Sequence, residues 1–171
     1  MAKFTFFWKG NHQTMTIANT DQQITIKKFY SPANCDLYVT DVYAKCTSGE
    51  RHELWTDLNN VHNTIQGPWC IGGDFNVILD PEEKMGGKTH KMRDSLDFSS
   101  CMDAYEVVDL GFIGLKFTWC NNRKPQKIIW KMLDKMFIND DWAEIFHTNQ
   151  VNHLGRTGSD HRPLLINCHN D

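Results

Sequence analysis

The stretch Trp69-Cys70-Ile71-Gly72-Gly73-Asp74-Phe75-Asn76 places an apolar run directly before two glycines and two polar side chains. A short apolar run bounded by glycine is typical of a buried strand that ends at a tight turn. Asp74 and Asn76 are therefore expected at a strand end, where a sheet edge can hold them over a cleft. A Gly-Asp pair after a strand is also a common turn, so this stretch alone leaves both interpretations open.

A second polar cluster, Ser159-Asp160-His161, stands just before the apolar run 164–166. Carboxylates are hard oxygen ligands for Mg²⁺, and a neighbouring histidine can move a proton or balance charge on a phosphoryl group. The two clusters together indicate metal-assisted phosphodiester hydrolysis. The other histidines have no comparable setting and are expected to be surface or packing residues: His12, His52, His62, His90, His147, His153 and His169.

Several motifs, in a fixed order along the chain, resemble the endonuclease/exonuclease/phosphatase superfamily and, within it, the endonuclease domain of plant non-LTR (LINE-type) retrotransposons. The motifs are Gly73-Asp74-Phe75-Asn76, Glu83-Lys84-Met85-Gly86-Gly87, Phe117-Thr118-Trp119-Cys120-Asn121-Asn122-Arg123, Leu133-Asp134 and Ser159-Asp160-His161-Arg162-Pro163. An ordered series of motifs is much more specific than any one of them.

This resemblance implies a four-layered α/β sandwich of the deoxyribonuclease I type, in which helices flank two packed mixed sheets. It implies one domain over residues 1–171 that lacks the family's first strands. The implied activity is nicking of DNA with Mg²⁺ or Mn²⁺, to prime the reverse transcriptase domain of a parent polyprotein in the nucleus.

The resemblance also assigns roles to the polar residues of these motifs. Asp74 and Asn76 match the pair that positions the attacking water or the phosphate, and Asp160 matches a carboxylate of the metal and phosphate centre. Asp160 and Asp74 are thus the expected metal ligands. His161 matches the histidine that touches the scissile phosphate, and Asp134 matches the acid that orients its ring.

Four aromatic or hydroxyl residues near these motifs leave alternatives open. Tyr43 resembles the active-site tyrosine of the family, but an aromatic at a strand end is equally a core residue. Thr118 matches a substrate-side threonine, although a β-branched strand residue can be purely structural. Trp119 and Trp130 are expected to lie in the core rather than to stack on bases.

Basic residues gather between Lys116 and Lys135, where six basic side chains accompany the single acid Asp134. A hairpin here is either a solvated surface or a loop that enters a DNA groove. The resemblance favours the loop, with these substrate-binding residues: Asn121, Asn122, Arg123, Lys124 and Lys127. The whole chain carries 18 basic and 21 acidic residues, a net charge of −3, so it is not expected to wrap nucleic acid indiscriminately.

The chain also departs from the family pattern. Family members carry an asparagine and then a metal-binding glutamate on their first strands, whereas this chain has no glutamate before Glu50. Met132 and Lys135 stand where the family usually has arginines. We expect an N-terminally truncated domain whose metal site is impaired. Two alternatives remain: an inactive remnant that binds nucleic acid weakly, and a phosphatase of the same superfamily.

Composition fits a globular protein, with 40% hydrophobic and 23% charged residues. No apolar stretch is long enough to span a membrane, and no signal peptide is evident. The six cysteines form no C-x-x-C pair, so reduced thiols of an intracellular protein are expected. Strands are expected over residues 4–8, 15–18, 24–30, 36–43, 69–71, 116–120, 127–130, 151–154 and 164–168. Helices are expected from a Thr47 capping box to Ile65, over 92–105 and over 141–146.

Overall fold

The computed structural model describes residues 13–170. The strand expected over residues 4–8 lies outside this range. The largest sheet has six strands in the order β1-β2-β3-β4-β10-β6. Their bounds are β1 (Thr14–Asn19), β2 (Gln23–Tyr30), β3 (Cys35–Tyr43), β4 (Trp69–Asp74), β10 (Asp134–Ile138) and β6 (Val108–Asp109).

Strand β4 is the centre of this sheet, and all six of its residues are buried. It runs parallel to β3 and antiparallel to β10, so it is paired on both sides. The two glycines of β4 make this packing possible. A Cβ on Gly73, whose φ is +139°, would lie 2.1 Å from the Val42 carbonyl oxygen, and a Cβ on Gly72 would overlap the Met136 side chain.

The register of β4 fixes the position of its last residue. Asp74 stands directly opposite Asp134 at the start of β10, and opposite Tyr43 at the end of β3. Side chains opposite one another in neighbouring strands share a face of the sheet. Strand pairing therefore brings together three residues that are far apart in the sequence.

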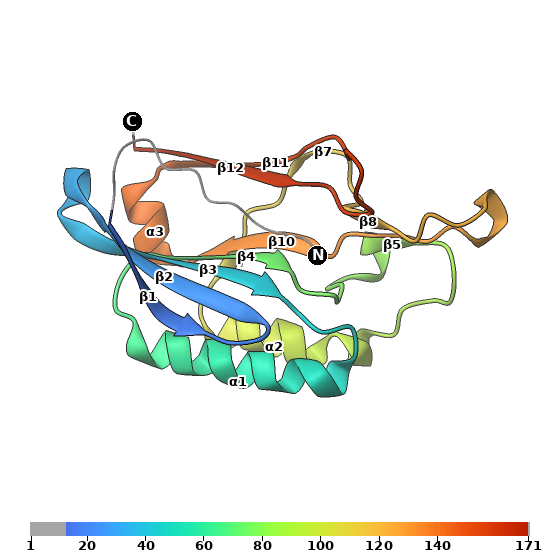
Figure 1. Ribbon diagram of the computed structural model, residues 1–171, viewed down its shortest axis with the longest axis horizontal. Coiled ribbons are helices and arrows are strands. Elements are labelled where there is room, and N and C mark those ends of the chain that lie inside the picture. The colour runs from blue at the N-terminus through green and yellow to red at the C-terminus, as the bar shows by residue number, and fades with distance from the viewer. Residues whose placement is uncertain (1–12, 171) are drawn as a thin grey trace.

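Helices α1 (Ser48–Thr64) and α2 (Leu96–Ala104) cover one face of the large sheet (Figure 1). The predicted capping box opens α1: the Thr47 hydroxyl accepts from the Glu50 amide and donates to the Glu50 carboxylate. The helix predicted over 92–105 is shorter than expected, because a separate 3-10 turn (Met92–Asp94) precedes α2. None of the helices described here is long and apolar enough to cross a membrane.

A second sheet lies on the opposite face of the large one (Figure 1), with strand order β12-β11-β7. Its strands are β12 (Leu164–His169), β11 (Thr148–His153) and β7 (Ile113–Gly114), and α3 (Asp140–Ile145) packs at one end of the interface through Trp142. One core cluster lies between α1, α2 and the large sheet, and the other between the sheets. Residues 13–170 thus contain both sheets and one helical layer of the expected sandwich.

A third, small sheet has the order β5-β9-β8. Its strands are β5 (Lys84–Met85), β9 (Trp130–Lys131) and β8 (Trp119–Cys120). The strands expected over 116–120 and 127–130 are therefore too long, because residues 125–127 form a 3-10 turn and most of the hairpin is irregular. Short strands leave the hairpin tip exposed beside the site.

Candidate active site

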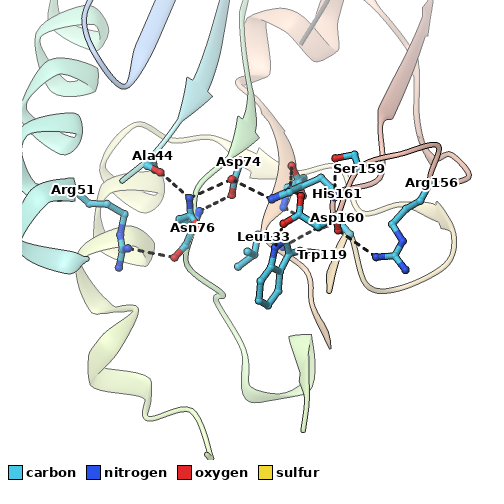
Figure 2. Close-up of polar contacts among 12 residues, drawn as sticks. Ala44, Arg51, Asp74, Asn76, Trp119, Leu133, Arg156, Ser159, Asp160 and His161 are labelled. Atoms are coloured by element: carbon cyan, nitrogen blue, oxygen red, sulfur yellow. Dashed lines mark hydrogen bonds and ion pairs between the residues drawn. The ribbon is translucent and has the colours of Figure 1, made fainter. Parts of the chain in front are cut away.

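Three charged side chains from separate elements meet at the end of β4. Asp74 and Asp134 are each 1% exposed, and they face one another across the β4–β10 ladder. His161 follows the bend before β12, and its Nδ1 lies 3.0 Å from Asp134 Oδ2. Its Nε2 lies 3.7 Å from Asp74 Oδ2. Figure 2 shows Asp74 between Asn76 on one side and His161 on the other.

Burial of like charges sets the protonation behaviour of this group. Desolvation, followed by the negative charge of Asp134, raises the pKa of Asp74 to about 7. Burial by itself would lower the pKa of His161, but the hydrogen bond and charge of Asp134 outweigh it and raise that pKa above its usual value. The site therefore has an excess of negative charge, which favours a cation or a proton.

Asn76 follows the strand in a left-handed conformation, with φ of +49°. Its backbone amide donates to Asp74 Oδ1 at 2.9 Å, and its side-chain Nδ2 donates to the Ala44 carbonyl at 2.7 Å and to Asp74 Oδ2 at 3.2 Å. These contacts orient the amide group, and within residues 13–170 no donor is seen on its Oδ1. That oxygen can accept a hydrogen bond from a water or a substrate hydroxyl.

Arg51, on helix α1, contacts the backbone of the turn at Asn76. It is 6% exposed, and its guanidinium donates to the carbonyls of Lys45, Cys46 and Asn76. Burial lowers the pKa of Arg51. The sequence analysis missed this residue, because its partners are carbonyl groups that only the fold brings together.

Asp160 lies beside the central group and is held by a tryptophan. Trp119 Nε1 donates to Asp160 Oδ2 at 2.9 Å, and an isolated bridge pairs Trp119 with His161. The Ser159 hydroxyl accepts from the His161 backbone amide. The expectation that Trp119 and Trp130 are core residues is wrong, since both are only half-buried. Trp119 instead positions a carboxylate of the site.

Thr118 does not lie where a substrate could reach it. It is 0% exposed, and its hydroxyl accepts from the backbone amides of Leu133 and Asp134 at 2.9 and 3.1 Å. The expected direct contact of Thr118 with substrate is therefore wrong. The hydroxyl fixes the backbone that carries Asp134, so its part in the site is positional.

Tyr43 stands one strand away from Asp74, at the same level of the sheet, and is 42% exposed. It is not a core aromatic. A phenol at this position is open to solvent at the edge of the site, where it can donate a hydrogen bond.

The β8–β9 hairpin projects beside the site, and its residues divide into two kinds. Asn121 and Asn122 are used inside the hairpin: the Asn121 side chain bonds the backbone at Lys127 and Ile129, and Asn122 Oδ1 accepts from Arg156. The basic side chains are exposed, and they are Arg123, Lys124 and Lys127.

Arg156 joins the hairpin to the loop that carries the site. Its guanidinium lies 5.1 Å from the Trp130 ring centroid, and its Nη1 donates to Asn122 Oδ1 at 3.2 Å and to the Asp160 carbonyl at 3.4 Å. Sequence analysis missed Arg156 too. The only signal was an arginine three residues before the Ser-Asp-His motif.

The ligand atoms of Asp74, Asp134 and His161 all lie within 4.8 Å of one another, and this arrangement could hold a metal ion. Two carboxylates and an imidazole suit a divalent cation. A cation would also neutralise the charge that raises the pKa of Asp74.

No protein-family model and no curated protein sequence matches this chain. Solved structures do match it. The endonuclease domain of TRAS1, a telomere-specific non-LTR retrotransposon, is 13% identical with a TM-score of 0.72, and the match covers 92% of this chain and 68% of that one. An endonuclease/exonuclease/phosphatase family protein from Leptotrichia buccalis is 12% identical with a TM-score of 0.57, covering 93% of this chain and 61% of that one.

TDP2 from D. rerio, complexed with a single-strand DNA product, is 14% identical with a TM-score of 0.51, and the match covers 91% of this chain and 66% of that one. The chain thus spans about two thirds of the length of these structures. At such low identity the likeness shows the fold, and it confirms the predicted deoxyribonuclease I type of α/β sandwich.

Proposed function

We propose that this chain, which has the fold of endonuclease/exonuclease/phosphatase proteins, is a divalent-metal-dependent phosphodiesterase that nicks DNA. The observation that carries the proposal is the in-register pair Asp74 and Asp134, with the His161 ring held against both carboxylates. A buried like-charge pair is costly to fold, and such pairs are concentrated where a cation or a reaction uses them.

The geometry gives each residue a task. Asp134 accepts from Nδ1 of His161 and so fixes the imidazole tautomer that leaves Nε2 toward Asp74 and the substrate. Nε2 can then hold or deliver a proton at the phosphoryl oxygens or the leaving group. Asn76 presents Oδ1 to the attacking water, while its Nδ2 stays bonded to Asp74 and Ala44.

Asp74 and Asp134, whose ligand atoms lie close together beside His161, would hold the metal ion. Asp160, the other expected ligand, lies outside this group and accepts from Trp119. When bound, Mg²⁺ or Mn²⁺ would stabilise the negative charge that develops on the phosphate. Because burial and Asp134 raise the pKa of Asp74 to about 7, a cation competes there with a proton, and its affinity rises with pH across that region.

Nicking of supercoiled plasmid in Mg²⁺ or Mn²⁺ tests the proposal. We expect weak nicking, because the metal-binding glutamate of the family pattern has no counterpart before Glu50. A chelator should abolish this nicking, and Asp74→Asn and His161→Ala should both suppress it. Asp41→Asn is the matched control, since Asp41 is a second carboxylate whose pKa burial raises to about 7, yet it lies outside the group at Asp74. Metal-independent nicking, or equal activity in all variants, would refute a metal site at Asp74. Absence of nicking in either metal would favour the inactive remnant.

The exposed basic hairpin favours DNA over a small phosphomonoester. Replacement of Arg123, Lys124 and Lys127 with alanine should weaken DNA binding and reduce its salt dependence by up to about three units of slope. Faster hydrolysis of inositol phosphates than of plasmid, with an unchanged slope, would favour the phosphatase alternative. The fold shared with the TRAS1 endonuclease domain supports a role in which the nick primes a reverse transcriptase of the same nuclear polyprotein.

A further inference from the structure

The small sheet β5-β9-β8 holds two lysines that neither the site nor a structural ion pair uses. Lys84 in β5 stands directly opposite Lys131 in β9. Residues directly opposite in an antiparallel pair share a face, and like charges in that arrangement are destabilising. Within residues 13–170 no carboxylate lies within ion-pair distance of either ammonium. The pair is therefore uncompensated.

Of the two lysines, Lys131 is connected to the site through Trp119. Its Nζ lies 5.6 Å from the centroid of the Trp119 ring, and Trp119 Nε1 donates to Asp160. Lys131 is half-buried beside this ring, so its ammonium has limited freedom to move into solvent. Burial and the positive charge of Lys84 lower its pKa, and the charges of Arg51 and Asp74 also act on it.

Trp119, Lys131 and Lys84 lie side by side on three neighbouring strands and form a row, with Lys84 at the end farthest from Asp160. Its ammonium donates to the Lys88 carbonyl, and it lines a hollow of about 200 Å³ between Pro81 and His90. A Cβ on Gly86, whose φ is +85°, would lie 2.4 Å from the Ile128 carbonyl oxygen, so this loop packs tightly on the hairpin. Lys84 is thus held next to Lys131 by a loop that cannot easily move away.

We propose that Lys131 and Lys84 form a subsite for backbone phosphates of the substrate strand next to the one that is cleaved. This inference rests on the proposed function and adds to it a direction for the strand: from Asp160 past Trp119 to Lys131 and then to Lys84. Neighbouring strands of a sheet lie about 4.8 Å apart, so the row spans a short stretch of polynucleotide. An anion between the lysines removes the repulsion that the free protein carries.

Binding of a duplex oligonucleotide in the presence of a chelator tests the subsite without requiring hydrolysis. Lys131→Met and Lys84→Met keep most of the aliphatic stem and remove one charge each. Each should reduce the slope of log affinity against log salt by about 0.9, and the double variant by about twice that. Equivalently, the binding advantage of the native chain over a single variant should shrink roughly threefold between 50 and 200 mM salt.

Two further variants keep the test decisive. Lys131→Arg retains the charge and should retain the slope, which separates loss of a phosphate contact from loss of packing. Lys27→Met is the matched control, because Lys27 is already paired with Asp36 at 2.9 Å on the large sheet, and its loss should leave the slope unchanged. An unchanged slope in Lys131→Met and Lys84→Met, or an equal decrease in Lys27→Met, would overturn the subsite.

The outcome is separable from the proposed function itself. If the native chain nicks plasmid but the lysine variants bind with native slopes, the subsite is wrong and the active site stands. If no nicking occurs in any metal but the lysine variants lose slope, the subsite holds on a protein that binds DNA without cleaving it.

Discussion

Asp134 and Lys135 are consecutive residues of β10, and they form two very different charge clusters. Side chains alternate between the faces of a strand, so the two residues point to opposite faces of the large sheet. Asp134 meets Asp74 and His161, where negative charge is in excess. Lys135, whose side chain is 1% exposed, bonds Glu83 at 2.5 Å and Asp109 at 3.4 Å. The Asp109 side chain keeps 33% exposure to solvent, so the buried Lys135 ammonium and the buried Glu83 carboxylate compensate each other.

Within β10, the Asp134 cluster is thus assigned to function and the Lys135 cluster to stability. A compensated buried cluster fixes the fold, because removal of one partner leaves the other charges without solvent or a counter-charge. An uncompensated cluster costs stability, and it is retained where a ligand or a reaction supplies the missing charge. Four substitutions test this distinction.

The largest effect is expected from His161→Ala on the Asp134 side. Loss of the imidazole should lower metal-dependent nicking roughly 100- to 10,000-fold, if Nε2 transfers a proton. The free energy of unfolding should change less than in a Lys135 variant, because the His161 side chain keeps 15% exposure against 1% for Lys135, and the remaining carboxylates can bind a cation. Plasmid nicking and urea denaturation measure the two quantities, and a large loss of stability with modest loss of nicking would break the comparison.

On the opposite side, Lys135→Met should act on stability. Glu83 and Asp109 would lose their shared counter-charge, at a cost of about 3–5 kcal/mol of unfolding free energy. The double variant Lys135→Met with Glu83→Gln should recover part of that loss, because less uncompensated charge remains. Urea denaturation of the three proteins provides the measurement, and a native-like midpoint for Lys135→Met would show that this cluster is not structural.

A third test uses Asp41, which lies in β3 and has a buried Oδ1 without a partner within residues 13–170. Burial raises its pKa to about 7, whereas an unfolded aspartate titrates near 3.9. Between about pH 4 and 7 the folded state keeps a proton that the unfolded state releases, so stability falls as pH rises through this window. Asp41→Asn should remove that part of the fall, at most about 1.4 kcal/mol per pH unit.

Denaturation of both proteins at pH 5 and pH 7.5 gives the comparison, and nicking should be unaffected by Asp41→Asn. An identical pH dependence in the two proteins would mean that Asp41 keeps an ordinary pKa. The uncompensated charge at Asp74 would then be special to the site rather than a general consequence of burial in this sheet.

The smallest effect is expected at Thr118, whose hydroxyl accepts from the backbone amides of Leu133 and Asp134. Thr118→Val leaves two buried amides without an acceptor, and should cost about 1–3 kcal/mol of stability. Thr118→Ser keeps the hydroxyl and should cost less, with nicking closer to native. Equal loss in both variants would assign the effect to the methyl group instead.

Much of this arrangement could be predicted from local sequence. The apolar run before Gly72 and Gly73 predicted a buried strand ending at Asp74, and Thr47 with Glu50 predicted the start of α1, because period and capping act over a few residues. Ordered motifs predicted the fold, and they named Asp134 as the partner of His161. Hairpin strand lengths and the break before α2 were not predicted, since tertiary contacts decide where weak local preferences end.

Only the tertiary structure decided which charges are compensated. The sequence shows Lys131 and Lys135 four residues apart as equivalent members of one basic segment. Strand pairing places Lys135 against Glu83 and Asp109, and places Lys131 opposite Lys84, with no carboxylate of residues 13–170 within ion-pair distance of Lys131. The same holds for Thr118, whose burial turned an expected substrate contact into a support for Asp134. Long-range register has this effect because a charge or hydroxyl is stabilised by what lies opposite it in space, and a local sequence pattern carries no record of that partner.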